Sequence, residues 1–175
     1  GGLRSDDNRD WEVRVSGPGR YWVQVQPFPP AYVSSITSGG TDLATTPLTV
    51  TPGSPTAPIE ITLRNDPGTL SGTIDSLSPG GSRSGEQPRI WIYAIPLFPT
   101  TGRVPEGSLR DNGKFTLQDL APGSYRVVAC DARQEIDYHS PEGLAAWSGK
   151  GQVVIGDAKG TANVELRVVH GEASQ

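Results

Sequence analysis

The stretch "RDNGKFTLQDLAPGSYRVVA", from Arg110 to Ala129, decides the fold, because a similar stretch stands near the start of the chain. The earlier one, "DDNRDWEVRVSGPGRYWVQV", runs from Asp6 to Val25. An ungapped alignment that places Trp11 on Phe115 makes four positions after this pair coincide. They are Pro18 with Pro122, Gly19 with Gly123, Tyr21 with Tyr125, and Val23 with Val127. An internal repeat of this kind predicts two copies of one structural unit.

Each repeated stretch has the alternation of a β-strand. In "WEVRV", Trp11, Val13 and Val15 alternate with polar residues, as in a strand with one buried face, and "KFTL" repeats the pattern. The Pro-Gly pair suits the centre of a type II turn, which predicts a hairpin returning through "RYWVQVQ" or "SYRVVAC". The similarity resumes downstream, where "TAPIEITL" falls on "TANVELRV" and Tyr32 falls on Tyr138.

The two copies differ in what precedes them. Before its repeated stretch the second copy has two further predicted strands, "GTLSGTI" (Gly68 to Ile74) and "RIWIYAI" (Arg89 to Ile95). The first copy has no equivalent. We therefore expect residues 1–66 to form an incomplete unit and residues 67–175 a complete one, joined by the short "RNDPG". An incomplete unit leaves an unpaired strand edge or an exposed apolar face unless something fills it.

Composition supports an all-β chain and excludes some partners. Of the 175 residues, 22 are glycine and 16 proline, a content typical of many short strands joined by turns. The best helix candidate is a short connector, Ser140 to Lys150. A net charge of -4 disfavours nucleic acid and anionic membranes, and no apolar run is long enough to span a bilayer. Because the chain has no methionine, we expect that Gly1 is not a natural start.

No set of nucleophile, base and orienting group stands out. Cys130 is the only cysteine, and the apolar run "YRVVAC" predicts that it is buried and inert. His139 and His170 are the only histidines, and no recognisable motif surrounds either of them. We interpret both as surface or loop residues. The sequence thus predicts no catalytic residue, and a protein that is not an enzyme.

Metal and cofactor sites are likewise not predicted. Zinc and phosphate-binding motifs are missing from the sequence. Asp6, Asn8 and Asp10 have the spacing that opens a calcium loop, but no glycine or closing glutamate follows. We interpret this stretch as a polar turn. A second acidic group, interpreted as a solvated loop, consists of Asp131, Glu135 and Asp137.

Taken together, the second copy resembles a known family. The order "GTLSGTI", "RIWIYAI", "DNGKFTLQDLAPGSYRVVA" and "TANVELRV" is similar to the carboxypeptidase regulatory-like domain, a transthyretin-like β-sandwich, over Pro67 to His170. The first copy departs from the pattern at Arg9 and Trp11. The resemblance implies an all-β fold of two tandem transthyretin-like or Ig-like sandwich units, the first lacking its initial strands. The motif is carried by Asp111, Gly113, Phe115, Pro122, Gly123 and Tyr125.

The resemblance also implies a function. The stretch from Ala31 to Ser54 resembles the joins between tandem copies in large secreted or cell-surface bacterial proteins, whose modules act as spacers or adhesive units. We therefore expect an extracellular, non-catalytic structural module whose partners are other protein domains or identical subunits. A more specific form of this expectation is that the chains assemble into an oligomer or fibre by strand complementation of the first unit. Related collagen-binding B-type (CnaB-like) domains carry a Lys-Asn isopeptide bond, for which the trio here is Lys114, Asn163 and Glu165.

Aromatic side chains suggest an alternative function. In "RIWIYAI", Trp91 and Tyr93 lie on the face opposite Ile92, and Trp22 points away from Tyr21. If exposed, these aromatic faces could stack on a polysaccharide, as in a carbohydrate-binding accessory module of a secreted enzyme. If buried, they would pack against the neighbouring copy or the connector that carries Trp147. The candidate contact residues are Trp22, Trp91 and Tyr93.

Overall fold

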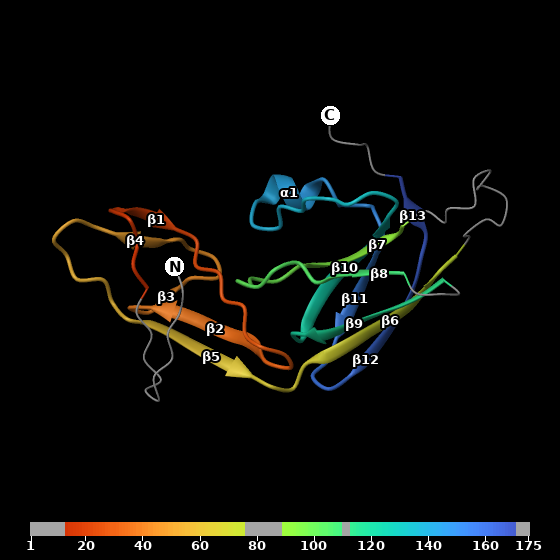
Figure 1. Ribbon diagram of the computed structural model, residues 1–175, viewed down its shortest axis with the longest axis horizontal. Helices are drawn as coiled ribbons and strands as arrows, with labels where there is room; N and C mark the ends of the chain where they lie inside the picture. The colour runs from red at the N-terminus through yellow and green to blue at the C-terminus, as the bar shows by residue number, and fades with distance from the viewer. Residues whose placement is uncertain (1–12, 76–88, 110–112, 171–175) are drawn as a thin grey trace.

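The protein is an all-β molecule with one short helix, as Figure 1 shows. The computed structural model describes residues 13–75, 89–109 and 113–170. Within these ranges, every strand ladder joins two strands on the same side of Pro67. We refer to residues 13–66 as the N-terminal half and to residues 67–170 as the C-terminal half. The chain passes from one to the other between β5 and β6, near the bottom centre of Figure 1.

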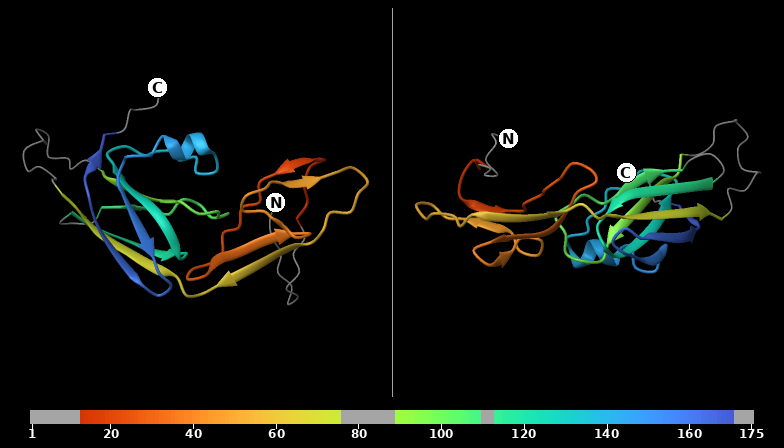
Figure 2. Two further views of the ribbon diagram at one scale, coloured as in Figure 1. Left: turned by 180° about the vertical axis from the view of Figure 1, so that it is seen from behind. Right: turned by 90° about the horizontal axis from the view of Figure 1, so that it is seen from below.

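The C-terminal half is a β-sandwich of two sheets, also seen in Figure 2. One sheet has the order β12-β6-β9, in which β12 and β6 are parallel. The other has the order β11-β10-β7-β8, with β13 added beside β10. The strands are β6 (Gly68–Ile74), β7 (Trp91–Pro96), β8 (Glu106–Ser108), β9 (Lys114–Leu120), β10 (Gly123–Cys130), β11 (Gln152–Gly156), β12 (Thr161–Leu166) and β13 (Val168–Val169).

The sandwich core forms where the apolar alternation of the sequence meets between the sheets. Tyr125, Val127 and Ala129 of β10 point into it, as predicted, and pack with Phe115 of β9 and Leu166 of β12. Burial of side chains of this size on both inner faces is the main source of stability of a sandwich. The two early strands predicted for this copy are confirmed as β6 and β7.

The predicted hairpin at Pro122-Gly123 is wrong. β9 pairs with β6 and β10 pairs with β7, so the chain crosses from one sheet to the other at this point. Gly19 and Gly123 have φ angles of 159° and 155°, whereas a type II turn needs about +80° at its third position. The Pro-Gly pair therefore marks the corner between two sheets in the C-terminal half, and in the N-terminal half it leads into β1.

The N-terminal half contains two small sheets. β1 pairs with β4, and β2 pairs with both β3 and β5. β5 is the counterpart of β12 in the alignment. β12 has β6 beside it, in the parallel direction, whereas β5 has β2 beside it, in the antiparallel direction. The prediction that Tyr32 corresponds to Tyr138 fails, because Tyr32 begins a strand and Tyr138 lies in a connector. The strands are β1 (Gly19–Tyr21), β2 (Tyr32–Ser38), β3 (Thr41–Asp42), β4 (Leu48–Val50) and β5 (Ile59–Arg64).

The first copy of the repeated strand does not form. Residues 13–15 of "WEVRV" are outside any strand, contrary to the prediction, and Trp11 lies outside the described residues. β1 has 3 residues, whereas β10, its counterpart, has 8. β1 is shorter than β10 because it lacks a second neighbouring strand. β10 is hydrogen-bonded to β7 along its second edge, whereas no described strand lies along the second edge of β1.

A connector of residues 131–150 covers the outer face of β7 and β10. It contains α1 (Pro141–Ala145), which confirms the predicted helical turn; the side chain of Ser140 caps it by accepting a hydrogen bond from the Gly143 amide. Trp147 of this connector packs on Tyr93, Ile95, Val128 and Cys130. The outer apolar face predicted for "RIWIYAI" is thus buried within the C-terminal half.

The junction between the halves is short and held by Asp66. Its carboxylate accepts two hydrogen bonds from the Arg64 guanidinium, of 3.0 and 2.6 Å, and one of 2.8 Å from the Tyr32 hydroxyl. Its backbone carbonyl accepts from the Lys159 amide of the C-terminal half at 3.2 Å. The two side-chain donors, Arg64 first and then Tyr32, lower the pKa of the Asp66 carboxyl to about 2.

Candidate functional site

The two copies share one tyrosine hydrogen bond. The Tyr125 hydroxyl donates to the carbonyl oxygen of Ala121 at 2.7 Å, and the Tyr21 hydroxyl donates to that of Gly17, also at 2.7 Å. Each acceptor lies four residues before its tyrosine. This match supports the sequence alignment of the two copies at the level of atoms, and it allows other positions to be compared pair by pair.

Matched core positions have opposite exposure in the two halves. Val13 aligns with Leu117, and the exposed fractions are 66% and 5%. Ile61 aligns with Leu166, at 43% and 1%. The same alternation of apolar residues is therefore buried in the C-terminal half and exposed to solvent in the N-terminal half. Three buried apolar side chains of the described residues belong to the N-terminal half and eighteen to the C-terminal half.

A further part of the N-terminal half is extended but unpaired. Residues 22–26, which we call the open segment, follow β1 and align with residues 126–130 of β10. Val23 and Val25 are half-buried, and Trp22, Gln24 and Gln26 between them are exposed. In the described part of the chain, no strand pairs with the open segment. An unpaired strand edge of this kind can accept another strand.

Sequence reasoning did not single out the exposed apolar side chains of β5. Ile61 and Leu63 lie directly opposite Ile36 and Val33 of β2, on the same face of their sheet. The sequence did contain a pattern that marks these side chains as core-type positions, because "TAPIEITL" aligns with a strand whose Val164 and Leu166 belong to the core. By the alignment, these side chains and those of Val13, Val23 and Val25 match core positions of the C-terminal half, and we call this set of residues the open face of the N-terminal half.

Trp22 is half-exposed and contacts the other half. Its ring stacks on the imidazole of His139, with ring centroids 5.3 Å apart, and His139 lies against Tyr138 at 4.0 Å. Asp137 holds this turn by accepting hydrogen bonds from the Ser140 hydroxyl and from the amides of His139 and Ser140, and these donors, the hydroxyl first, lower its pKa. The Trp22 ring is thus engaged within the chain on at least one side.

The other two candidate contact residues do not join Trp22. Tyr93 is 2% exposed, and its hydroxyl accepts a hydrogen bond from the Gln134 amide, so it presents no surface to a ligand. Trp91 is partly covered by two guanidinium groups, those of Arg89 and Arg133, which lie 4.6 and 5.3 Å from its ring centre. The stacking platform considered for Trp22, Trp91 and Tyr93 is therefore not assembled in this structure.

The motif residues of the C-terminal half have structural positions. Phe115 and Tyr125 are in the core, and Gly113, with φ of 73°, starts the turn into β9 in a conformation that favours glycine. Pro122 and Gly123 form the corner between the sheets, and Pro18 and Gly19 lead into β1 in the N-terminal half. A methyl group on Gly123 would lie 2.4 Å from the ring of Phe98. Asp111 lies outside the described residues.

The titratable side chains do not gather into a reactive cluster. Burial, with a smaller contribution from Asp131, raises the pKa of the Cys130 thiol to about 11. His170 pairs with Asp131 at 2.7 Å on the surface, and His139 takes part in the Trp22 stack. Within residues 13–75, 89–109 and 113–170, no three His, Cys, Asp or Glu side chains are grouped as metal ligands would be. The calcium candidates Asp6, Asn8 and Asp10 lie outside these ranges.

The trio considered for an isopeptide bond is spread over the outer face of one sheet. Lys114 of β9 and Glu165 of β12 both lie opposite Thr73 of β6, one on either side, and both are exposed. Two strand spacings, about 10 Å, therefore separate them. A lysine in this setting has neither the burial nor the adjacent carboxylate that would activate its amine.

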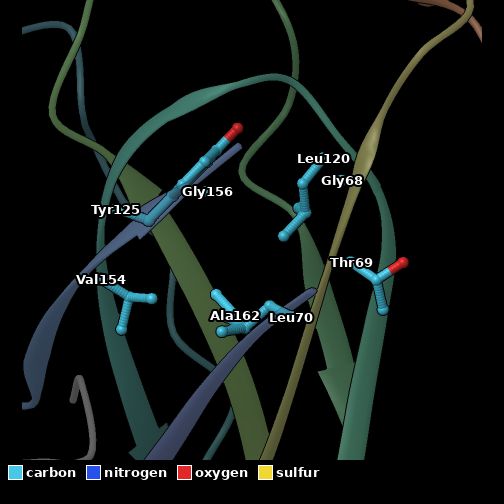
Figure 3. A pocket seen from close by; sticks show the side chains of 8 residues that line it. All are labelled: Gly68, Thr69, Leu70, Leu120, Tyr125, Val154, Gly156 and Ala162. Atoms are coloured by element: carbon cyan, nitrogen blue, oxygen red, sulfur yellow. The ribbon is translucent and has the colours of Figure 1, made fainter. Parts of the chain in front are cut away.

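Cavities in the C-terminal half are too small or too open to define a ligand site. The one in Figure 3, at the corner end of the sandwich, has a volume of about 10 Å³, close to the minimum for one water molecule. Its lining is mostly apolar and includes Leu70, Leu120 and Tyr125. A second hollow, between residues 149–152 and 165–169, is an open surface groove.

Comparison with known proteins adds no assignment. No protein-family model matches the chain, and no curated protein matches it significantly. None of the helices that the structure describes is long and apolar enough to cross a membrane. The open face and the open segment of the N-terminal half are thus the features of this molecule that most need a functional explanation.

Proposed function

We propose that this protein is a non-catalytic structural and interaction module whose incomplete N-terminal unit is completed by a strand from another subunit. The observation that carries the proposal is the opposite exposure of matched core positions, above all Ile61 and Leu166. An apolar face of this kind on a soluble protein marks an interaction surface. Strand addition at an open edge satisfies the backbone and covers the face in one step.

Chains that complete one another in this way join into an oligomer or a fibre. An extracellular or cell-surface location and membership of the carboxypeptidase regulatory-like family are the setting we propose for such a module, on the resemblance of the C-terminal half alone. The carbohydrate-binding alternative is weaker, because Tyr93 is buried and Trp91 lies under two arginines.

Light scattering over a wide range of chain concentration tests the proposal. We expect the molar mass to grow with concentration, and the growth to stop when Ile61→Asp places a charge on the open face. Val153→Asp is the matched control, because Val153 is an exposed apolar residue of β11 in the C-terminal half. A wild-type chain that stays monomeric at every concentration would contradict assembly through this unit.

A further inference from the structure

The complete half shows what kind of strand the incomplete half lacks. In the C-terminal half, β10 is hydrogen-bonded to β11 on one edge and to β7 on the other. In the N-terminal half, β1 is paired with β4 in the matching register: Gly19 lies opposite Val50, as Gly123 lies opposite Gly156. Beside β1 the edge that stays open is therefore the one that β7 covers in the other half, and β7 covers the same edge along the counterparts of the open segment.

The pairing of β7 also gives a direction and a register. β7 runs antiparallel to β10, with Ala94 opposite Val127 and Ile92 opposite Ala129. Val23 and Val25 are the counterparts of Val127 and Ala129. A strand in the same place would run antiparallel to the open segment and would put its own apolar side chains opposite Val23 and Val25.

The outer faces of the two halves differ. On β10 the outward residues Val128 and Cys130 are apolar and buried under the connector that carries Trp147. Their counterparts in the open segment are Gln24 and Gln26, which are polar and exposed. A strand added to the open segment would therefore have one face against the open face and the other in water.

We infer that the open segment binds a strand of one particular chemistry: an extended, antiparallel segment of another chain that is apolar at every second residue and polar at the residues between. This inference rests on the proposed function and adds to it the edge, the direction and the pattern of the partner. It excludes a strand that is apolar on both faces, as β7 is, since its second face would be left exposed to solvent.

A set of synthetic peptides tests the pattern on the full chain. The first is Arg89 to Leu97 with Trp91, Tyr93 and Ile95 replaced by threonine, which keeps the inward residues of β7. The second also has Ile90 and Ile92 replaced by threonine, so that neither of its faces is apolar. The third has the sequence of the first but carries N-methyl groups on the amides, which removes the ladder donors. Binding is measured by the fluorescence anisotropy of labelled peptides, and hydrogen exchange locates the amides that become protected.

We expect the first peptide to bind and to protect the amides of residues 22–26, and the other two to bind at least about tenfold more weakly. In the protein, Val25→Asp should weaken binding by about tenfold or more, because it buries a carboxylate against the added strand. Val153→Asp should leave binding unchanged. Hydrogen exchange of β10 should also stay unchanged, which shows that the peptide has not displaced β7.

Equal binding of the first two peptides, or wild-type affinity of Val25→Asp, would overturn the inference. Failure of all peptides with a chain that still assembles in light scattering would also overturn it and would leave the proposed function standing. A chain that is monomeric and binds no peptide would overturn both.

Discussion

Tyr21 and Tyr125 make the same hydrogen bond, each from its hydroxyl to the carbonyl oxygen four residues earlier, at 2.7 Å in both cases. Their surroundings differ, because Tyr125 is buried in the sandwich core and Tyr21 is partly exposed. The repeated sequence therefore sets the local geometry around the Pro-Gly pair in both halves. What it does not set is burial, which depends on the strands that lie next to it.

Removal of the two hydroxyls should separate these contributions. Tyr125→Phe removes the hydroxyl of a tyrosine that is buried in the core, and we expect a loss of about 1 kcal/mol in the free energy of unfolding. Tyr21→Phe should cost less than half as much, because the Tyr21 side chain is itself partly exposed to water. Urea unfolding of the two variants at neutral pH measures the difference, and equal losses would contradict the unequal burial.

Truncation of matched core residues should show the same asymmetry more strongly. Leu166→Ala removes a buried side chain from the sandwich and should cost about 3 kcal/mol. Ile61→Ala, at the matching position, should cost less than about 1 kcal/mol, because Ile61 is already exposed. Urea unfolding of both variants measures these costs. The cost of Ile61→Ala should rise when the first peptide is bound, and a cost as large as that of Leu166→Ala in the free chain would mean that the open face is covered.

The Asp66 carboxylate should make the junction sensitive to acid. Its pKa is lowered from 3.8 to about 2 in the folded protein, so its ionised form stabilises the fold above about pH 4, and this contribution is lost as the pH falls towards 2. Asp66→Asn should lower the melting temperature at pH 7 and reduce the difference between pH 4 and pH 2. Thermal unfolding across this range measures the effect.

Asp75→Asn is the matched control for the junction. Asp75 lies on the surface, 3.8 Å from Arg167, and an exposed pair of this length contributes little. We expect the melting temperature of this variant to follow that of the wild type at each pH. An Asp66→Asn curve parallel to the wild-type curve would show that the carboxylate does not hold the junction.

The Trp22–His139 stack should couple the two halves. A double-mutant cycle with Trp22→Ala and His139→Ala is expected to give a coupling energy of about 1 kcal/mol, as for other stacked ring pairs. The cycle is measured by urea unfolding at constant pH. Trp22→Ala with Glu142→Ala, an exposed residue of α1, serves as the control cycle and should show additivity. Additive effects of Trp22→Ala and His139→Ala would mean that the contact contributes nothing.

Cys130 should be unreactive in the folded protein. Burial raises the pKa of its thiol to about 11, so very little thiolate forms at pH 8, and the side chain is covered by the connector. Ellman's reagent should react with less than about a tenth of the chains at pH 8 in buffer and with all of them in urea. Rapid reaction in buffer would show that the connector opens away from β10.

The sequence predicts the C-terminal half well because each of its strands has a partner. The alternation in "KFTLQDL" and "SYRVVAC" places Phe115, Leu117, Tyr125 and Val127 in the core, and the structure confirms this. An alternating sequence forms the predicted strand when a neighbouring strand is present to pair with it. The hairpin failed because Pro-Gly fits both a turn and a corner between sheets, and the choice depends on long-range pairing.

The N-terminal half shows the limit of the same reasoning. "RYWVQVQ" has the pattern of a strand as clearly as "SYRVVAC", yet only Gly19–Tyr21 forms one. Periodicity describes which side chains share a face, but a strand also needs a hydrogen-bonded neighbour. In the part of the chain that the structure describes, Trp22 to Gln26 have no such neighbour. The contact between Trp22 and His139 could likewise not be predicted from local sequence patterns, because it depends on how the two halves pack together.

The parallel pairing of β6 and β12 has a mechanical consequence. The chain enters the C-terminal half at the start of β6 and passes the end of β12 on its way out, and Leu166 lies beside Ile74 at the far end of the ladder. A force that stretches this half along its chain would therefore, once β13 is released, pull the two strands lengthwise in opposite directions. All six residue pairs of the ladder would be loaded at once in shear, and none could be unzipped singly. Such a geometry suits a domain that carries tension.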